Sequence, residues 1–363
     1  MKSSSVSSSL QNCTLMASSR SVKLFLLWKL CSSIILLLHT KSTEGLADDS
    51  DWLQRISGNG APCRTIFVDP LGRLGNFTTI QSAIDSVPSN NEKWVCIYIK
   101  KGIYREKVKI PEDKPYIILK GQAKRTTEIV WDDHDNIVQS PTFTSLADNI
   151  IAKSISFRNS YNNPINKKHP RVPAVAARVS GDKNVFHRCG FYGLQDTLWD
   201  DQGRHYFKRC TIQGAVDFIF GGGQSIYENC AISVLGGALG PGVTGFITAQ
   251  GRSNPDDASG FVFKECNVFG SGSALLGRAW RAYARVVFYR SNFTDVVNPR
   301  GWDAWNFTGQ ESQLTFSEYG CYGHGSDTSL RVSWEKKLSL ATINQLASTS
   351  FVDSEGWLSS QPF

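Results

Sequence analysis

One six-residue pattern recurs as Phe186-His187-Arg188-Cys189-Gly190-Phe191, Phe207-Lys208-Arg209-Cys210-Thr211-Ile212 and Tyr227-Glu228-Asn229-Cys230-Ala231-Ile232. Further copies start at Phe263 and Phe288, so the successive steps are 21, 20, 36 and 25 residues. A period near 20 residues, with short strands and no helical phase, is typical of a solenoid of stacked β coils. A β-sandwich is the alternative, but it supplies no reason for one small residue at a fixed interval. We therefore expect an all-β chain folded as a parallel β-helix.

The small position of the repeat is a cysteine in four copies and a serine in the fifth. If the coils stack, Cys189, Cys210, Cys230 and Cys266 form an interior ladder of thiols; a Cys230–Cys266 disulfide is the alternative. Removal of an N-terminal leader would leave seven cysteines, so at least one of them stays unpaired.

Two aspartates follow the repeat at the same interval. Asp196 lies seven residues after Cys189, and Asp217 lies seven residues after Cys210. On adjacent coils, whose strands lie about 4.8 Å apart, their carboxyl groups would meet. Two carboxyls at that distance cannot both ionise freely, so the pKa of one is raised. The spacing predicts an acid and a nucleophile at one site, although each aspartate alone would more often serve as a turn residue.

The ends of the chain have their own patterns. Residues 48–61 are polar and are expected to form a flexible lead-in to a domain at 62–360. Residues 77–88 predict a short helix with Thr78 and Gln81 as a capping box, which would cover the open end of the stack. Residues 338–348 predict a helical tail that packs against the outside.

Residues 1–47 have the composition of a signal peptide. Basic residues accompany an apolar stretch at 24–38, and Lys29 interrupts it, which disfavours a full membrane span. An uncleaved anchor and a start at Met16 are the alternatives. Sequons at Asn76, Asn292 and Asn306 agree with a secreted glycoprotein that has no stable membrane association after cleavage.

Composition excludes some classes of function. The 363 residues are 41% hydrophobic and 20% charged, as in a soluble globular chain, and the formal net charge is +7. No Lys/Arg-rich run is present, so nucleic acid is not an expected partner. Asp132-Asp133-His134-Asp135 lacks a second histidine cluster, so we expect a solvated loop, no metal and no cofactor. Gly323-His324-Gly325 resembles a polygalacturonase motif but lacks companion aspartates, so a turn is expected.

Five blocks in order resemble the signature blocks of the plant pectin methylesterases, over about residues 62–358. The blocks are Gly102-Ile103-Tyr104-Arg105-Glu106, Gly193-Leu194-Gln195-Asp196-Thr197-Leu198, Asp217-Phe218-Ile219-Phe220-Gly221, Ile247-Thr248-Ala249-Gln250-Gly251-Arg252 and Leu276-Gly277-Arg278-Ala279-Trp280. The resemblance implies a right-handed parallel β-helix, and we expect a monomer. Many plant members carry an N-terminal inhibitor-like pro-region, which we do not expect here because only residues 48–61 separate the leader from the family-like domain. The resemblance further implies a secreted cell-wall enzyme that acts on methyl-esterified homogalacturonan (pectin), with a proteinaceous pectinesterase inhibitor as a further partner.

The resemblance also implies catalytic roles. Asp217 would attack the methyl ester carbonyl, and Asp196 would protonate the departing methanol and then activate water. Gln195 would donate a hydrogen bond to the oxyanion. Arg278 would keep Asp217 ionised, which agrees with the need of a weak carboxylate nucleophile for an ionising partner. The structural alternative for Arg278 is an ion pair without a catalytic role.

Further residues are expected to contact the substrate. Trp280 would pack against a sugar ring, since aromatic rings offer rigid apolar area, and Thr142 matches a substrate-contacting threonine. Trp199 stands where the family commonly has tyrosine. Trp199, Trp302 and Trp305 would either line the cleft or fill the core.

One departure from the family pattern affects the expected chemistry. Pro173 stands where the family has a glutamine that helps to bind the oxyanion, and proline has no side-chain donor. Loss of one such donor typically costs about 2.7–4 kcal/mol of transition-state stabilisation. The alternative function is therefore a catalytically weakened pectin-binding β-helix of the cell wall. Pectate lyase or polygalacturonase chemistry is a third reading, which predicts shortened chains instead of methanol.

Overall fold

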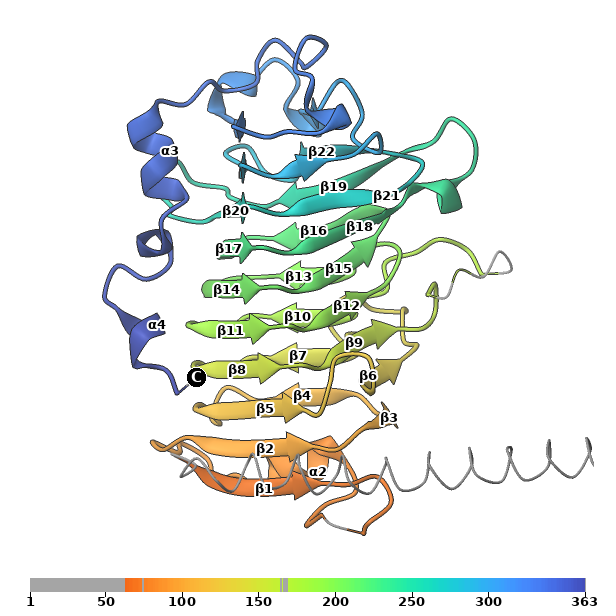
Figure 1. Ribbon diagram of the computed structural model, residues 1–363, viewed down its shortest axis with the longest axis vertical. Helices are drawn as coiled ribbons and strands as arrows, with labels where there is room; N and C mark the ends of the chain where they lie inside the picture. Colours follow the sequence, from red (N-terminus) through yellow and green to blue (C-terminus); the bar gives the residue numbers. More distant parts are fainter. Residues whose placement is uncertain (1–62, 74, 164, 166–168, 363) are drawn as a thin grey trace, which may run out of the picture. The chain divides into compact units, whose positions relative to one another are not determined.

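Three parallel sheets wind around one core. The computed structural model describes residues 63–73, 75–163, 165 and 169–362, so the predicted signal peptide and the lead-in lie outside the described residues. Successive strands of each sheet come from successive coils, which Figure 1 shows as stacked rungs. The expected parallel β-helix is confirmed. Among the described residues, no helix is long and apolar enough to cross a membrane.

The three sheets are named A, B and C. Sheet A contains β1 (Arg64–Val68), β2 (Val95–Ile99), β5 (Ile117–Gly121), β8 (Ile150–Lys153), β11 (Asn184–His187), β14 (Arg204–Lys208), β17 (Gln224–Glu228), β20 (Gly260–Lys264), β23 (Arg285–Tyr289) and β26 (Thr315–Tyr319). Sheet B contains β3 (Gly102–Arg105), β6 (Thr127–Trp131), β9 (Ser156–Asn159), β12 (Gly190–Tyr192), β15 (Thr211–Gly214), β18 (Ala231–Leu235), β21 (Asn267–Ser271) and β24 (Asn292–Phe293). Sheet C contains β4 (Val108–Ile110), β7 (Phe143–Ser145), β10 (Ala177–Val179), β13 (Leu198–Asp200), β16 (Val216–Gly221), β19 (Thr244–Gln250), β22 (Ser273–Ala279) and β25 (Trp302–Asp303).

The five copies of the repeat occupy the same place on their coils. Its first aromatic residues stack face to face inside sheet A, with ring centroids 4.5–5.0 Å apart, in the order Phe186, Phe207, Tyr227, Phe263 and Phe288. Because each ring is fully buried, this column forms a continuous aromatic spine of the core.

The four predicted ladder cysteines are buried and free, so the ladder is confirmed and the Cys230–Cys266 disulfide is wrong. Each thiol donates to a backbone carbonyl of the preceding coil; Cys210 Sγ, for example, lies 3.3 Å from the oxygen of Phe186. The disulfide of the described chain joins Cys63 to Cys96 and ties β1 to the edge of β2. A small residue is needed at the ladder because the backbone turns there from sheet A to sheet B.

The expected helix at the first coil is α2 (Ile80–Asp85), which contacts β1, β2 and β4. Its capping residue is Thr79, so the predicted capping box of Thr78 and Gln81 is wrong. The carboxylate of Glu106 accepts hydrogen bonds from the first two amides of the helix, at 2.8 and 3.0 Å. A tertiary contact therefore does the work that the local pattern assigned to Gln81.

The C-terminal segment runs along the side of the stack (Figure 1). The predicted tail helix is α3 (Leu340–Leu346), and α4 (Trp357–Ser360) follows it. Five short 3₁₀ turns complete the described elements: η1 (Gly236–Leu239), η2 (Trp305–Phe307), η3 (Glu311–Gln313), η4 (His324–Ser326) and η5 (Thr349–Phe351). Turn η5 contacts β17, where the side-chain amide of Gln224 donates to the carbonyl of Phe351.

Candidate active site

Two aspartates on neighbouring coils form the centre of the site. Asp196 lies just before β13, and Asp217 lies in β16, one coil further on. The register pairs Gln195 with Val216 and Leu198 with Ile219, so the two aspartates hold equivalent positions. Their relative exposures are 9% and 7%. The predicted placement on adjacent coils is therefore confirmed, while the catalytic roles remain predictions.

Irregular backbone aims both side chains. Asp196 and Asp217 have φ values of 57° and 46°, in the left-handed region that residues with a Cβ rarely adopt. At Asp217 the register between β16 and β19 also shifts, which marks a β-bulge. Bulges re-aim side chains and are frequent next to active sites. Left-handed backbone also occurs at other corners of the coils, so at the site it serves to orient the two aspartates rather than to mark them out.

Arg278, on β22, holds the carboxylate of Asp217. Its Nε donates to Asp217 Oδ1 at 2.8 Å, and its terminal nitrogen donates to Oδ2, so the pair is bidentate. The guanidinium lies between two rings, 4.2 Å from the centroid of Phe246 and 3.7 Å from that of Trp305. A bidentate pair between stacked rings fixes the orientation of both partners.

The two carboxyl groups differ in their electrostatics. Burial and, to a smaller extent, the charge of Asp217 raise the pKa of Asp196 to about 8, against the opposing charge of Arg278. Burial also raises the pKa of Asp217, but there Arg278 opposes it both by hydrogen bonding and by its charge. The dependence of Asp196 on the charge of Asp217 shows that the two groups interact. The arrangement favours a protonated Asp196 beside an ionised Asp217 at neutral pH.

An aromatic wall borders the pair on the outer face of sheet C. Trp199 stacks on Phe220 with centroids 5.5 Å apart, and Trp280 meets Phe220 edge-on at 6.0 Å. Val175 and Ala249 pack in the same cluster. Gly251 lets the Trp280 ring approach, because a Cβ there would lie 2.8 Å from a ring carbon. The structure thus brings the predicted Trp199 and Trp280 together beside the site.

A row of outward-facing residues extends this wall along the helix axis. The register aligns, coil by coil, Lys109, Thr144, Arg178, Trp199, Phe220, Ala249, Arg278 and Asp303. At the Lys109 end lies a cavity of about 380 Å³, which is also lined by Lys107 and Arg178. A linear sugar chain laid along the row would meet aromatic rings near the aspartates and cations beyond them.

The two other predicted residues, Gln195 and Thr142, lie in different surroundings. The side chain of Gln195 is half-buried and forms no hydrogen bond with any described residue, so its amide is available as a donor. Its carbonyl accepts from the amide of Ala174 at 3.2 Å, which places Pro173 beside it. Thr142 is fully buried, and its hydroxyl donates to the carbonyl of Arg158 at 3.0 Å. A substrate contact by Thr142 therefore finds no support in this geometry.

The sequence left open whether Trp302 and Trp305 line the cleft or fill the core, and the structure gives a different answer for each. Trp302 is fully buried and stacks on Phe316 in the core. Trp305 is 38% exposed and covers Arg278, so it belongs to the site. Phe246 was not predicted as a site residue, and its sequence carries no signal for that place, because its role depends on stacking against Arg278.

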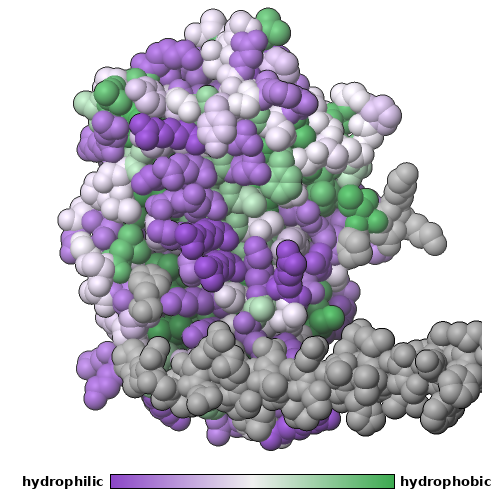
Figure 2. Space-filling view, in the orientation of Figure 1, coloured by the Kyte–Doolittle hydropathy of each residue, from purple (hydrophilic) through white to green (hydrophobic). Residues whose placement is uncertain are grey.

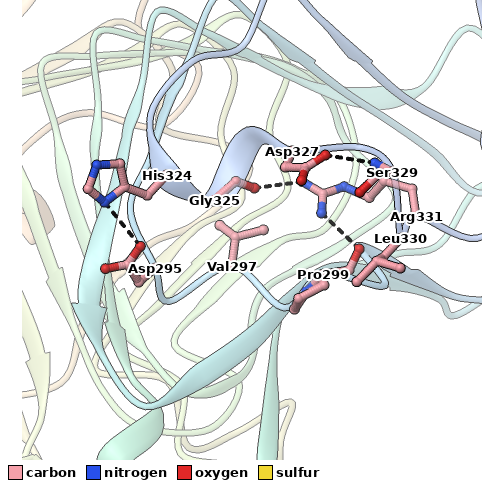
Figure 3. Close-up of a pocket in the computed structure, with 9 residues that line it drawn as sticks. All are labelled: Asp295, Val297, Pro299, His324, Gly325, Asp327, Ser329, Leu330 and Arg331. Atoms are coloured by element: carbon pink, nitrogen blue, oxygen red, sulfur yellow. Dashed lines mark hydrogen bonds and ion pairs between the residues drawn. The ribbon is translucent and has the colours of Figure 1, made fainter.

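The remaining motifs form no second catalytic centre. In Figure 3, His324 of turn η4 meets Asp295 at 3.4 Å beside a cavity of about 240 Å³. Both side chains are more than four-fifths exposed, which agrees with a turn rather than with a polygalacturonase site. In the loop after β6, Asp132 and Asp133 pair with Arg105 and Lys107. Within the part of the chain that the structure describes, no group of three metal-ligating side chains occurs.

A parallel β-helix that carries a buried carboxylate pair beside an aromatic wall has the features expected of a hydrolase that acts on polysaccharides. Residues 67–355 match the pectinesterase family. The chain belongs to this family and is a carboxylic ester hydrolase.

The proteins and solved structures that are similar to this chain agree with its assignment to the family. Probable pectinesterase 29 of Arabidopsis thaliana is 60% identical over 300 residues, which are 82% of this chain and 89% of that protein. The structure of a pectin methylesterase from carrot is 29% identical, with a TM-score of 0.74 over 82% of this chain and 96% of that one. A pectin methylesterase in complex with a hexasaccharide is 26% identical, with a TM-score of 0.71 over 81% of this chain and 98% of that one.

Proposed function

We propose that this protein is a secreted pectin methylesterase that hydrolyses methyl esters of homogalacturonan, with Asp217 as nucleophile and Asp196 as general acid and base. The observation that carries the proposal is the bidentate Arg278–Asp217 pair one coil from a carboxyl group whose pKa is raised to about 8. Secretion follows removal of residues 1–47, with residues 48–61 as the lead-in and residues 62–360 as the catalytic domain, and the substrate is cell-wall pectin.

The reaction has two halves. In the first, Asp217 attacks the ester carbonyl, the bond to the methoxy oxygen breaks, and the proton of Asp196 leaves with methanol. In the second, ionised Asp196 takes a proton from water as the water oxygen attacks the acyl carbon, and Asp217 departs. The products are methanol and galacturonic acid, which releases its proton to solvent and becomes a carboxylate, and Asp196 is protonated again. The Gln195 amide supplies a donor to the oxyanion in both halves.

The pH profile of methanol release tests the division of roles. We expect kcat/KM for methyl-esterified pectin to fall as the pH rises through about 8, because Asp196 loses the proton that methanol needs. On the acid side, activity falls as Asp217 becomes protonated, above the ordinary aspartate range, because burial raises its pKa. An Asp196→Asn variant cannot lose a proton there, so its residual activity should lack the alkaline limb. Retention of that limb in the variant would reject Asp196 as the acid.

The Arg278 fork is a second test of the site. In Arg278→Lys, the ammonium keeps one charge but loses the bidentate geometry and the stacking on Phe246 and Trp305. We expect kcat to fall by about 10- to 100-fold, the worth of one charge-assisted hydrogen bond. The matched control is Arg331→Lys, which breaks a bidentate pair with Glu318 outside the site and should lower stability but not kcat. Equal kcat losses in both variants would mean that Arg278 is only structural.

Pro173 favours one competing function, a pectin-binding protein with weak catalysis. The two functions are separated by methanol release from pectin by the unaltered protein. Release at a rate that Asp217→Asn abolishes and Asp196→Asn strongly lowers supports the enzyme. Binding of pectin without release at any pH would leave the binding function alone. Shortened or unsaturated chains would instead indicate polygalacturonase or lyase chemistry.

A further inference from the structure

A column of mostly basic residues runs along sheet A, on a different face of the coil from the catalytic pair. The register aligns, on successive coils, Lys120, Lys153, His187, Lys208, Glu228 and Lys264. Two exposed arginines, Arg188 and Arg209, directly follow the members on β11 and β14. Figure 2 shows the result as a band of hydrophilic residues over β8, β11, β14 and β17. We call these residues the basic column.

The charges of the basic column are poorly balanced. Its one acidic member, Glu228, already contacts Lys208 at 3.1 Å and Lys264 at 3.9 Å. Arg188 and Arg209 form no ion pair with any residue in the described part of the chain. Burial, together with the charges of Arg188, Lys153, Arg209 and Lys208, lowers the pKa of His187 to about 4, so its ring is neutral at neutral pH. Like charges on neighbouring strands destabilise a sheet, so the fold does not require this arrangement.

The backbone gives no reason for arginine at these places either. Arg188 and Arg209 have φ values of 55° and 54°, in the left-handed region that favours glycine and asparagine. The equivalent residue on the next coil is Asn229, with the same φ of 54°. The same corner holds Ser154, Glu265 and Arg290 on other coils, with φ of 56°, 54° and 47°, so the backbone does not select arginine there and the fold does not require the charge.

We propose that the basic column is a second binding site, which holds the de-esterified, free-carboxylate stretches of homogalacturonan that the proposed reaction produces. Coils repeat about every 4.8 Å, so the lysines of the column and the two arginines beside it form a linear array of positive charge that suits a linear polyanion. The reaction takes place on sheet C, so a product chain held on sheet A leaves the catalytic groove open. The inference rests on the proposed function, because that reaction supplies the carboxylates.

The test uses the full chain and the variant Arg188→Asn/Arg209→Asn, in which asparagine suits the left-handed backbone. We expect binding to fully de-esterified polygalacturonate at about 0.05 M salt to weaken about tenfold or more, and most of the difference to vanish at about 0.5 M. Methanol release from short, fully methyl-esterified oligogalacturonates should be unchanged. The matched control is Arg290→Asn, at the equivalent corner with φ of 47° but beyond the acidic Glu265, and it should bind as the unaltered protein does.

Each outcome decides the matter. Unchanged polygalacturonate binding in the double variant, with methanol release intact, would overturn the second site while leaving the proposed function in place. Absence of methanol release from the unaltered protein would instead overturn the proposed function. An equal loss of binding to polyglutamate of matched charge would show a general anion surface and overturn the assignment to polyuronate.

Discussion

Asp217→Asn is expected to lower kcat for methanol release by roughly 10⁴-fold or more, the order of loss seen when the nucleophile of a hydrolase is removed. Asparagine has nearly the same shape, and its side-chain oxygen still accepts from Arg278 Nε, which lies 2.8 Å from Asp217 Oδ1. It has no ionised oxygen to attack an ester, so chemistry is lost while the fold and the aromatic wall remain. The measurement is methanol release at saturating pectin, together with pectin binding and thermal unfolding.

The matched control for this variant is Glu318→Gln. Glu318 also accepts two hydrogen bonds from an arginine, Arg331, at 2.6 and 3.1 Å, but it lies on sheet A, away from the aspartate pair. It should lose some stability and keep kcat within a few-fold. If Asp217→Asn kept more than a few per cent of the activity, the carboxylate would not be the nucleophile. If it lost pectin binding as well, its role would be to hold the groove together.

The period of the sequence was enough to predict the coil and the meeting of Asp196 with Asp217. Both follow from counting, since equal intervals along the chain become neighbours when coils stack. Arg278 lies 61 residues from Asp217, and its partner came from the family resemblance rather than from spacing. The left-handed backbone conformation of both aspartates could not be predicted, because the presence of an aspartate does not by itself indicate a positive φ.

Contacts between distant segments account for what sequence reasoning missed. Thr142 matched a motif, but the carbonyl of Arg158 and the surrounding strands enclose it. The cap of α2 depends on Glu106, which belongs to the second coil. Trp305 contacts Arg278 from turn η2, which follows β25 and lies beyond the last copy of the sequence repeat. Local patterns describe one coil at a time, whereas these roles arise between coils.

A buried charged group in the core is the clearest feature that the sequence concealed. His205 and Asp200 are fully buried, and His205 Nδ1 lies 2.5 Å from Asp200 Oδ1. His205 Nε2 donates to the carbonyl of Gly181 at 2.9 Å, and the hydroxyl of Tyr227 donates to Asp200 Oδ2 at 2.5 Å. Both imidazole nitrogens face acceptors, so the ring is a protonated imidazolium paired with a carboxylate.

The surroundings of this group are built to hold it. A Cβ on Gly223 would lie 2.1 Å from Asp200 Oδ1, which explains a glycine in the Gly221-Gly222-Gly223 run that has no phosphate-binding sequence. The hydroxyl of Ser225 lies 3.5 Å from His205 Nδ1. Burial lowers the pKa of His205, but the charge and hydrogen bond of Asp200, with the Gly181 carbonyl, outweigh it, so the pKa lies above its ordinary value.

His205→Gln is expected to lower the free energy of unfolding by about 3–5 kcal/mol, because it leaves the Asp200 charge buried without a cation. The control His187→Gln, on the neighbouring strand but half-exposed, should change it by only about 0.5 kcal/mol.

The sign of the pH dependence follows from the raised pKa of His205. The contribution of His205 is complete below about pH 6.5 and is lost as the pH rises through the higher pKa of the folded state. Asp196 adds a slope in the same direction, but it does so in both proteins, so the difference between unaltered protein and variant isolates His205. That difference in unfolding free energy, measured by denaturant between about pH 6 and about pH 9, should therefore shrink as the pH rises. A difference that stayed constant across this range would mean that the ring is neutral and that the pair is an ordinary hydrogen bond.

If the variant does not fold, the double variant Asp200→Asn/His205→Gln, which removes both charges, should restore folding. Failure of the double variant to fold would reject the uncompensated carboxylate as the cause.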